Sequence, residues 1–284
     1  MRVLVVGAAS GLGASLAASL LQNTQHTLVT VDDLRVERDL QNLQFALSHK
    51  RGDRHRFYLC QISDAHIANK LFELERPDWV VFCKTPEKDT YHQSLVRTII
   101  SAKQYGARLI YLAPDSWSSD RNESYKYGIE ICESESNDGT AHVLNTGRIF
   151  GPRQEEGDII THAMGRILNG EWPNTALASD RPREWLYVKD ALSAIETLIC
   201  SNNISGKYTA SSGNIASEHE VMMCLQMISE GRGFEFSKHD IHILDSSKLI
   251  ELGWSPKYQL RDALEHTLSW YSINAWARNA VAVI

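Results

Sequence analysis

The first thirteen residues, MRVLVVGAASGLG, constrain the fold more than any other segment of this chain. An apolar, β-branched run leads into Gly7, Gly11 and Gly13, and an Ala- and Leu-rich amphipathic stretch follows to Leu21. This order predicts a strand, a tight glycine turn and a helix. Gly7 lets the chain turn sharply, and the missing Cβ atoms of Gly11 and Gly13 let a pyrophosphate and the strand approach the backbone. The free N–H groups at the start of the helix would attract phosphate.

An acidic residue ends the next predicted strand. This strand runs from His26 to Val31, and Asp32 follows it, roughly 20 residues after the glycines. A carboxylate there can accept hydrogen bonds from both hydroxyls of an adenosine ribose, and it repels a 2′-phosphate. The turn, the helix and the acid together predict binding of NAD rather than NADP. The alternative is a similar unit that binds nothing and uses its glycines only for packing.

Composition and charge narrow the class of protein. The 284 residues are enough for one large α/β domain and a smaller lobe. The net charge of −6 leaves no excess of basic residues that would favour binding of nucleic acid. The five cysteines form no C-x-x-C pair, so we expect reduced thiols in a cytoplasm. The eleven histidines show no H-x-x-x-H or H-x-H pair, so no metal site is expected. We expect neither a signal peptide nor a membrane span.

Strands and helices alternate through the first half of the chain, which predicts a doubly wound parallel sheet. The alternation weakens after Gly151 and Pro152. We therefore predict an α/β, Rossmann-like domain over residues 1–146 plus about 184–204, and a smaller C-terminal substrate lobe over 147–183 and 205–284. Asp190 is expected to cap a helix at its N-terminus.

Five separated segments carry recognisable motifs. They are QISD at 61–64, PDWVV at 77–81, RIFGPRQ at 148–154, REWLYVKD at 183–190, and the segment from SK at 247–248 to LGWSPK at 252–257. In this order they resemble motifs of the extended short-chain dehydrogenases/reductases, the family of sugar-nucleotide epimerases and 4,6-dehydratases. The resemblance covers nearly the whole chain. One departure is the glycine spacing, which is that of the shorter, single-domain branch.

The resemblance implies NAD as cofactor and a nucleotide sugar as ligand. Gln61 and Ile62 would flank the adenine, with the Gln61 amide oxygen accepting from the adenine amino group. Arg183 would pair with the diphosphate, or alternatively form a surface ion pair with Glu184 or Asp180. The expected cofactor-binding residues are Gly7, Ser10, Gly11, Leu12, Gly13, Asp32, Asp33, Gln61, Ile62 and Lys84. The expected substrate-binding residues are Arg148 and Arg183.

The resemblance also shows where catalytic groups are expected and absent. Family catalysis uses a Tyr, a Lys four residues later, and a Ser or Thr at the end of the fifth strand. Pro114 stands at the Ser/Thr position and cannot donate a hydrogen bond. Tyr127 aligns best with the family Tyr, which places Ile131 at the Lys position. Choosing Tyr125 instead places Ile129 there, so neither alignment recovers the Lys.

Two other residues are candidates for the chemistry. Asp115 matches the acid of the dehydratases, but Ser116 follows it where they have Glu. Lys84 stands at the end of the fourth strand, where the family has small apolar residues. It either points to solvent or to the cofactor phosphates, or it replaces the missing active-site cation. The expected catalytic residues are therefore Tyr127, Asp115 and Lys84.

Two functions remain open at this point. The chain is either an enzyme of sugar-nucleotide metabolism with a rearranged site, or a catalytically degenerate relative that serves as a binding, regulatory or partner subunit. The resemblance further implies a homodimer joined through the helices at 91–105 and 124–136. The apolar residues Leu95, Ile99, Ile129 and Ile131 either contribute to that seam or face the sheet.

Overall fold

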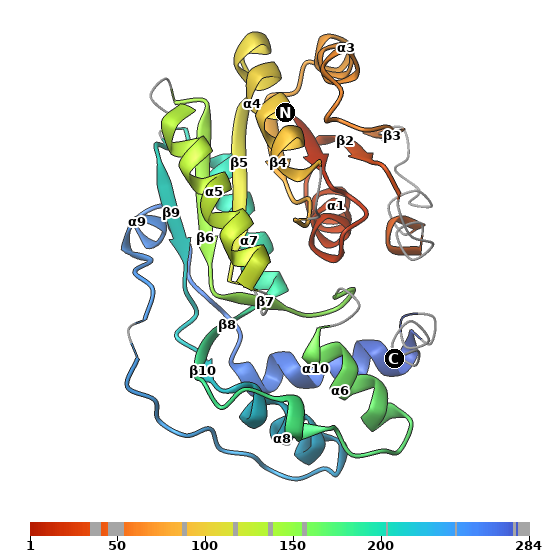
Figure 1. The fold of residues 1–284 in the computed structure, drawn as a ribbon, viewed down its shortest axis with the longest axis vertical. Coiled ribbons are helices and arrows are strands. Elements are labelled where there is room, and N and C mark those ends of the chain that lie inside the picture. Colours follow the sequence, from red (N-terminus) through yellow and green to blue (C-terminus); the bar gives the residue numbers. More distant parts are fainter. Residues whose placement is uncertain are drawn as a thin grey trace.

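The computed structural model describes residues 1–34, 41–44, 54–86, 90–115, 119–135, 139–154, 158–202, 204–241, 243–274 and 277. Figure 1 shows a larger α/β unit and, at its lower edge, a smaller lobe of helices and short strands. Ser116 and the predicted helix end at 136 lie outside the described residues.

Seven described strands form the larger sheet, in the order β3-β2-β1-β4-β5-β6-β9, and every neighbouring pair is parallel. The strands are β1 (Arg2–Val6), β2 (Thr27–Asp32), β3 (His55–Leu59), β4 (Trp79–Phe82), β5 (Arg108–Pro114), β6 (Ala141–Thr146) and β9 (Lys207–Ala210). The predicted doubly wound sheet is therefore confirmed. Its central strands read as continuous apolar runs because both faces are covered.

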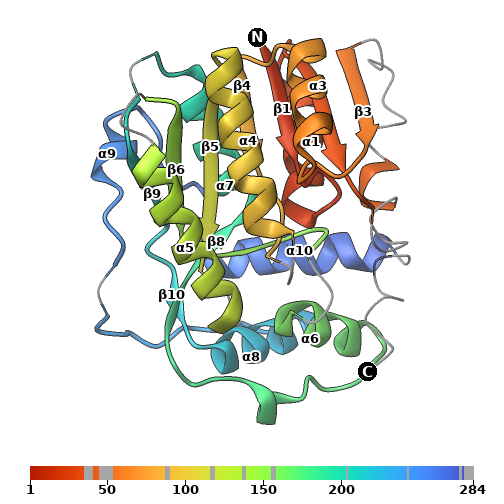
Figure 2. The ribbon, with the colours of Figure 1, turned by 45° about the horizontal axis from the view of Figure 1, so that its top comes forward.

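Helices cover both faces of this sheet. One face carries α1 (Gly11–Asn23) and α7 (Val188–Cys200), and the other carries α3 (Ala65–Glu75), α4 (Tyr91–Tyr105) and α5 (Ser119–Glu135). Strand β1 shows why: Val3 and Val5 pack into one core, and Leu4 and Val6 pack into the other. Figure 2 shows α4 and α5 side by side on the near face.

The smaller lobe contains a three-stranded sheet in the order β10-β8-β7. Its described elements are β7 (Arg148–Phe150), α6 (Ile159–Leu168), the 3-10 turn η3 (Thr175–Leu177), β8 (Arg183–Tyr187), β10 (Ile215–Ala216), α8 (Glu218–Ser229), α9 (Ser247–Ile250) and α10 (Leu260–Ile273). Two predicted boundaries differ from this arrangement. Strand β9, expected in the lobe, pairs with β6, and β8, expected in the larger domain, pairs with β7 and β10.

Asp190 does not cap its helix, contrary to the prediction. Tyr187 occupies the N-cap of α7, so Asp190 lies in the first helical turn. The buried carboxylate accepts hydrogen bonds from the backbone N–H groups of Lys257 (2.9 Å) and Tyr258 (3.2 Å). Asp190 therefore fastens the segment before α10 to the start of α7.

The residues expected at a dimer seam have mostly a different role. Leu95 and Ile99 are fully buried against the sheet, as the alternative interpretation predicted. Ile129 and Ile131 are partly buried and pack against the same core. No described helix is both long enough and apolar enough to cross a membrane.

Candidate functional site

The glycine turn joins β1 to α1 with two close backbone contacts. Gly7 has φ +79°, and a Cβ on it would lie 2.5 Å from the Cα of Lys84. A Cβ on Gly13 would lie 2.2 Å from the Gly7 carbonyl oxygen. Both positions exclude any larger residue, so these glycines hold the helix close to β1 and the turn close to the end of β4.

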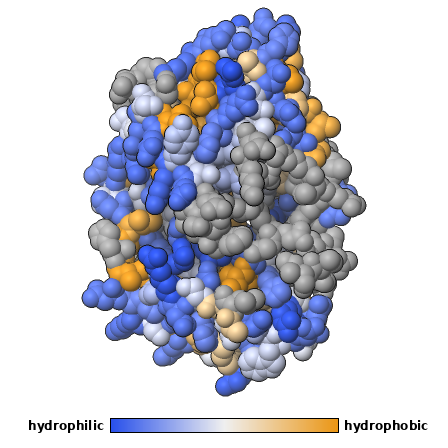
Figure 3. Space-filling model, in the orientation of Figure 1, coloured by the Kyte–Doolittle hydropathy of each residue, from blue (hydrophilic) through white to orange (hydrophobic). Residues whose placement is uncertain are grey.

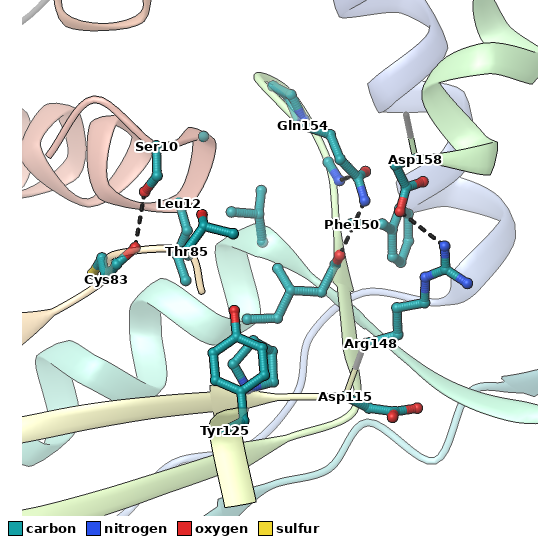
Figure 4. A pocket seen from close by; sticks show the side chains of 16 residues that line it. Ser10, Leu12, Cys83, Thr85, Asp115, Tyr125, Arg148, Phe150, Gln154 and Asp158 are labelled. Carbon is teal, nitrogen blue, oxygen red and sulfur yellow. Dashed lines mark hydrogen bonds and ion pairs between the residues drawn. The ribbon is translucent and has the colours of Figure 1, made fainter. Parts of the chain in front are cut away.

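Gly11 lies against a different segment of the chain, the one that follows β7. A Cβ there would lie 1.9 Å from the carbonyl oxygen of Arg153, so the segment after β7 lies directly over the start of α1. Ser10 caps this helix by accepting from the N–H of Gly13 (3.0 Å), and its hydroxyl donates to the Cys83 carbonyl (3.0 Å; Figure 4). The turn is thereby tied to the end of β4.

Asp32 lies at the end of β2 and faces this turn. One carboxylate oxygen accepts from the N–H of Ala9 (2.8 Å) and the other from that of Leu34 (3.0 Å). Burial raises the pKa of Asp32, while the two backbone donors oppose that shift. Each carboxylate oxygen has a further lone pair. The carboxylate is therefore held in place with acceptor capacity for a pair of ribose hydroxyls.

Lys84 pairs with Asp33, contrary to its predicted role as a catalytic cation. Its ammonium lies 3.0 Å from one Asp33 oxygen, and the two side chains are only 14% and 9% exposed. Its neighbours Cys83 and Thr85 line the cavity described next, whereas Lys84 does not. In an extended segment successive side chains point in opposite directions, which is why Lys84 turns back toward β2.

A cavity lies at the carboxyl ends of the parallel strands, the edge at which doubly wound sheets bind ligands (Figure 4). It extends from the glycine turn to the segment after β7. Residues that line it include Ser10, Gly11, Leu12, Cys83, Thr85, Pro114, Asp115, Tyr125, Arg148, Phe150, Gln154 and Asp158. Thr85, Gln154 and Asp158 were not among the predicted site residues. Thr85 follows the end of β4, Gln154 follows β7, and Asp158 caps α6.

Tyr125, rather than Tyr127, faces this cavity (Figure 4). The Tyr127 side chain is 52% exposed, and its ring packs edge-on against His92. The structure thus places the alternative, Tyr125, at the cavity and Tyr127 on the outer surface, because a helix turns through about 200° over two residues. Ile129 lies one turn after Tyr125 on the same face, where the resemblance to the family leads one to expect a Lys.

Two buried tyrosines seat α5 beneath Tyr125. Tyr111 donates to the backbone oxygen of Tyr125 (3.3 Å), and its hydroxyl pairs with that of Tyr91 at 2.8 Å. The Tyr91 ring also packs edge-on against the Tyr125 ring. A Cβ on Gly128 would lie 2.1 Å from the Tyr111 hydroxyl oxygen, so only glycine fits there.

The end of β5 offers the cavity a proline and an acid. Pro114 lines the cavity and brings no hydroxyl, at the place where the resemblance implies a Ser or Thr. Asp115 follows it and pairs with Arg183 at 3.1 Å across the start of β8. The predicted acid and the predicted diphosphate ligand therefore hold each other.

Arg148 lines the cavity and is held there by carboxylates, while its predicted contact with a substrate stays a prediction. Its side chain is 2% exposed, pairs with Asp158 at 2.8 Å and hydrogen-bonds Glu218. The guanidinium also lies over the ring of Trp185. Both terminal nitrogens are thus engaged by carboxylates from α8 and from the residue that caps α6.

Gln61 and Ile62 follow β3, at the same sheet edge as Asp32. Ile62 is buried in the core, and Gln61 is exposed. Their predicted contact with an adenine stays a prediction.

No protein-family model matches the chain. It is 25% identical to the low-salt glycan biosynthesis protein Agl12 of Haloferax volcanii, over 95% of this chain and 98% of that protein. It is 20% identical to the dTDP-glucose 4,6-dehydratase of Shigella flexneri, over 98% and 95% of the two chains.

Solved structures share the fold over the whole chain. The dTDP-glucose 4,6-dehydratase of Bacillus anthracis, in complex with NAD, has a TM-score of 0.85 at 18% identity and covers 99% of both chains. The UDP-glucuronic acid 4-epimerase of Bacillus cereus, in complex with UDP-glucuronic acid and NAD, has a TM-score of 0.77 at 17% identity, covering 96% and 100%. Over nearly its whole length the chain is therefore similar to sugar-nucleotide 4,6-dehydratases and epimerases, and it shares their fold.

Proposed function

We propose that this protein binds NAD and a nucleoside-diphosphate sugar at the cavity, and that its site lacks the groups for epimerase or dehydratase turnover at ordinary rates. The observation that carries the proposal is Tyr125, which faces the cavity with Ile129 at the family Lys position and Pro114 beside it. The relatives act on or bind nucleotide sugars, and several solved ones hold NAD.

The residues present fit a dinucleotide at its adenosine end. Asp32 is held by two backbone donors with lone pairs to spare, and α1 directs its free N–H groups toward the turn. When NAD is bound, its nicotinamide supplies a hydride acceptor. The chain's own contribution is to bind the ribose through Asp32 and to hold the turn in place through Ser10 and Gly7.

The part of the site expected to bind the sugar nucleotide departs further from the family motifs than the part expected to bind NAD. A guanidinium suits a diphosphate because it donates two parallel hydrogen bonds, and Arg183 is 21% exposed near the cavity. A diphosphate there would compete with Asp115 for Arg183. Tyr125 would present its phenol to the sugar, since its side chain lines the cavity.

A second candidate function is that of a regulatory or partner subunit that binds the same ligands without turning them over. The ion pair between Asp115 and Arg183 favours it, since the acid that resembles the dehydratases' acid is engaged. The five free cysteines suit a reducing compartment such as the cytoplasm.

Substitution of Asp32 tests the cofactor assignment. We expect the unmodified protein to bind NAD⁺ more tightly than NADP⁺, and Asp32→Asn to weaken NAD⁺ about tenfold, because charged hydrogen bonds to the ribose are lost. Calorimetric titration measures both affinities. Asp180→Asn, at a carboxylate that is 89% exposed, is the matched control. Equal affinities of the unmodified protein for NAD⁺ and NADP⁺ would rule out the Asp32 assignment.

We also propose a homodimer through the outer face of α4 and α5. Val96, Ile100 and Tyr127 are exposed there, at 36%, 46% and 52%. Figure 3 shows a hydrophobic patch over the α4 region of an otherwise mostly hydrophilic face. Light scattering at micromolar concentration is expected to give the mass of a dimer, and Ile100→Glu that of a monomer. A monomeric mass for the unmodified protein contradicts the proposal.

A further inference from the structure

The ion pair between Lys84 and Asp33 crosses the sheet edge at the place where a dinucleotide must lie. Strand β1 lies between β2 and β4. Asp33 directly follows β2, Lys84 follows β4 by two residues, and Gly7 directly follows β1. The side chains meet at 3.0 and 3.1 Å, and both are largely buried. The pair therefore spans the end of β1 and the start of the glycine turn.

Without Lys84, the charge at this sheet edge would disfavour binding of a pyrophosphate. Asp32 and Asp33 bring two carboxylates, while residues 11–14 of α1, GLGA, carry no charge. The helix N-terminus offers only about half a positive charge, against the two negative charges of a pyrophosphate. Arg153, whose backbone covers Gly11, holds its guanidinium over the ring of Trp270.

The Lys84 ammonium has a donor to offer. It carries three N–H groups, and the two oxygens of Asp33 account for two of them. Asp33 holds the ammonium beside the turn. The remaining N–H is then able to donate to an acceptor above the start of α1 while the ion pair with Asp33 stays intact. The backbone of Lys84 also lies close enough to Gly7 to require a glycine there, which places the residue directly beside the turn.

We infer that Lys84 binds the pyrophosphate of the dinucleotide, and that Asp33 is the residue that positions it. This inference rests on the proposed binding of NAD and deepens it by naming the side chain that neutralises the phosphates. It assigns Lys84 to the cofactor and leaves the sugar-binding part of the site without a lysine among the described cavity residues.

The test compares a ligand with a pyrophosphate and one without. Calorimetry of NAD⁺, with adenosine measured by competition, is done on the full chain and on Lys84→Met, Lys84→Arg and Lys70→Met. Lys84→Met is expected to weaken NAD⁺ about tenfold, because one charge-assisted hydrogen bond is lost, and to leave adenosine within about twofold. Lys84→Arg should retain most of the NAD⁺ affinity. Lys70 lies on α3, is 71% exposed and serves as the matched control.

Salt provides an independent readout. NAD⁺ affinity of the unmodified protein should fall as ionic strength rises, and the fall should be smaller for Lys84→Met. Melting curves of each variant show that it is folded before its affinity is compared.

Three outcomes overturn the inference. If Lys84→Met loses affinity for NAD⁺ and for adenosine equally, Lys84 only shapes the adenosine site. If both affinities are unchanged, the ion pair is purely structural. A larger loss for NADP⁺ than for NAD⁺ places Lys84 at the ribose instead. If the unmodified protein binds adenosine but not NAD⁺, or binds neither ligand, the proposed function itself fails.

Discussion

Purified protein supplied with NAD⁺ and a UDP-, dTDP- or GDP-linked sugar is expected to show no appreciable epimerase or 4,6-dehydratase turnover. Pro114 and Ile129 stand where the resemblance to the family implies a Ser or Thr and a Lys, two of its three catalytic groups. One positioned acid–base group contributes roughly 10²–10⁴ in rate, so losing two lowers the rate by about 10⁴-fold or more if their effects are independent. Product analysis after prolonged incubation measures the turnover.

The helix phase of α5 supplies a matched pair of variants. Pro114→Ser combined with Ile129→Lys restores the hydroxyl and places an ammonium one turn after Tyr125. Pro114→Ser combined with Ile131→Lys adds the same groups but turns the ammonium away by about 200°. Only the first combination is expected to raise formation of NADH. Turnover by the unmodified protein at ordinary enzyme rates, on the order of 10 s⁻¹, would contradict the expectation.

Arg148→Met is expected to destabilise the protein by about 3–5 kcal/mol, since removing one partner leaves buried carboxylates uncompensated. Asp158 and Glu218 are 6% and 9% exposed at their side chains and both bind this guanidinium. The free energy of unfolding is measured by denaturant titration. Arg166→Met is the control, because that arginine is 39% exposed and pairs with Glu171 at the surface, where about 1 kcal/mol or less is at stake.

This second prediction separates the structural role of Arg148 from the substrate-binding role that the sequence suggested. If Arg148→Met left the free energy of unfolding unchanged and weakened binding of a nucleoside diphosphate, the sequence-based role would be right. The pairing of Arg148 with two carboxylates argues for the opposite pattern.

The fold could be predicted because its determinants are local. The glycine turn follows an apolar strand, and α4 spans the range 91–105 expected for it. The two misplaced strands are short, and their assignment depends on which edge they join. Strand β9 pairs with β6, and β8 pairs with β7, through backbone hydrogen bonds. Such pairing leaves no recognisable pattern of side chains in the sequence.

The site was predictable at its cofactor end and not at its chemical end. Gly7, Gly13 and Asp32 lie as the spacing implied, because strand ends fix them. Tyr125 and Tyr127 could not be separated, since the choice depends on the rotation of α5 upon Tyr111. The partners of Arg183 and Lys84 come from distant segments, Asp115 and Asp33, and long-range ion pairs do not follow from spacing.

The most direct test of binding without turnover uses one sample of the protein that contains both ligands. Calorimetry first establishes that NAD⁺ and a sugar nucleotide are bound at saturation, and the absorbance of NADH is then followed from the moment of mixing. The account predicts binding of both ligands with no accumulation of NADH and no sugar product. Rapid appearance of NADH or product in the unmodified protein would show that Tyr125 acts without the missing lysine and hydroxyl, and would contradict the account.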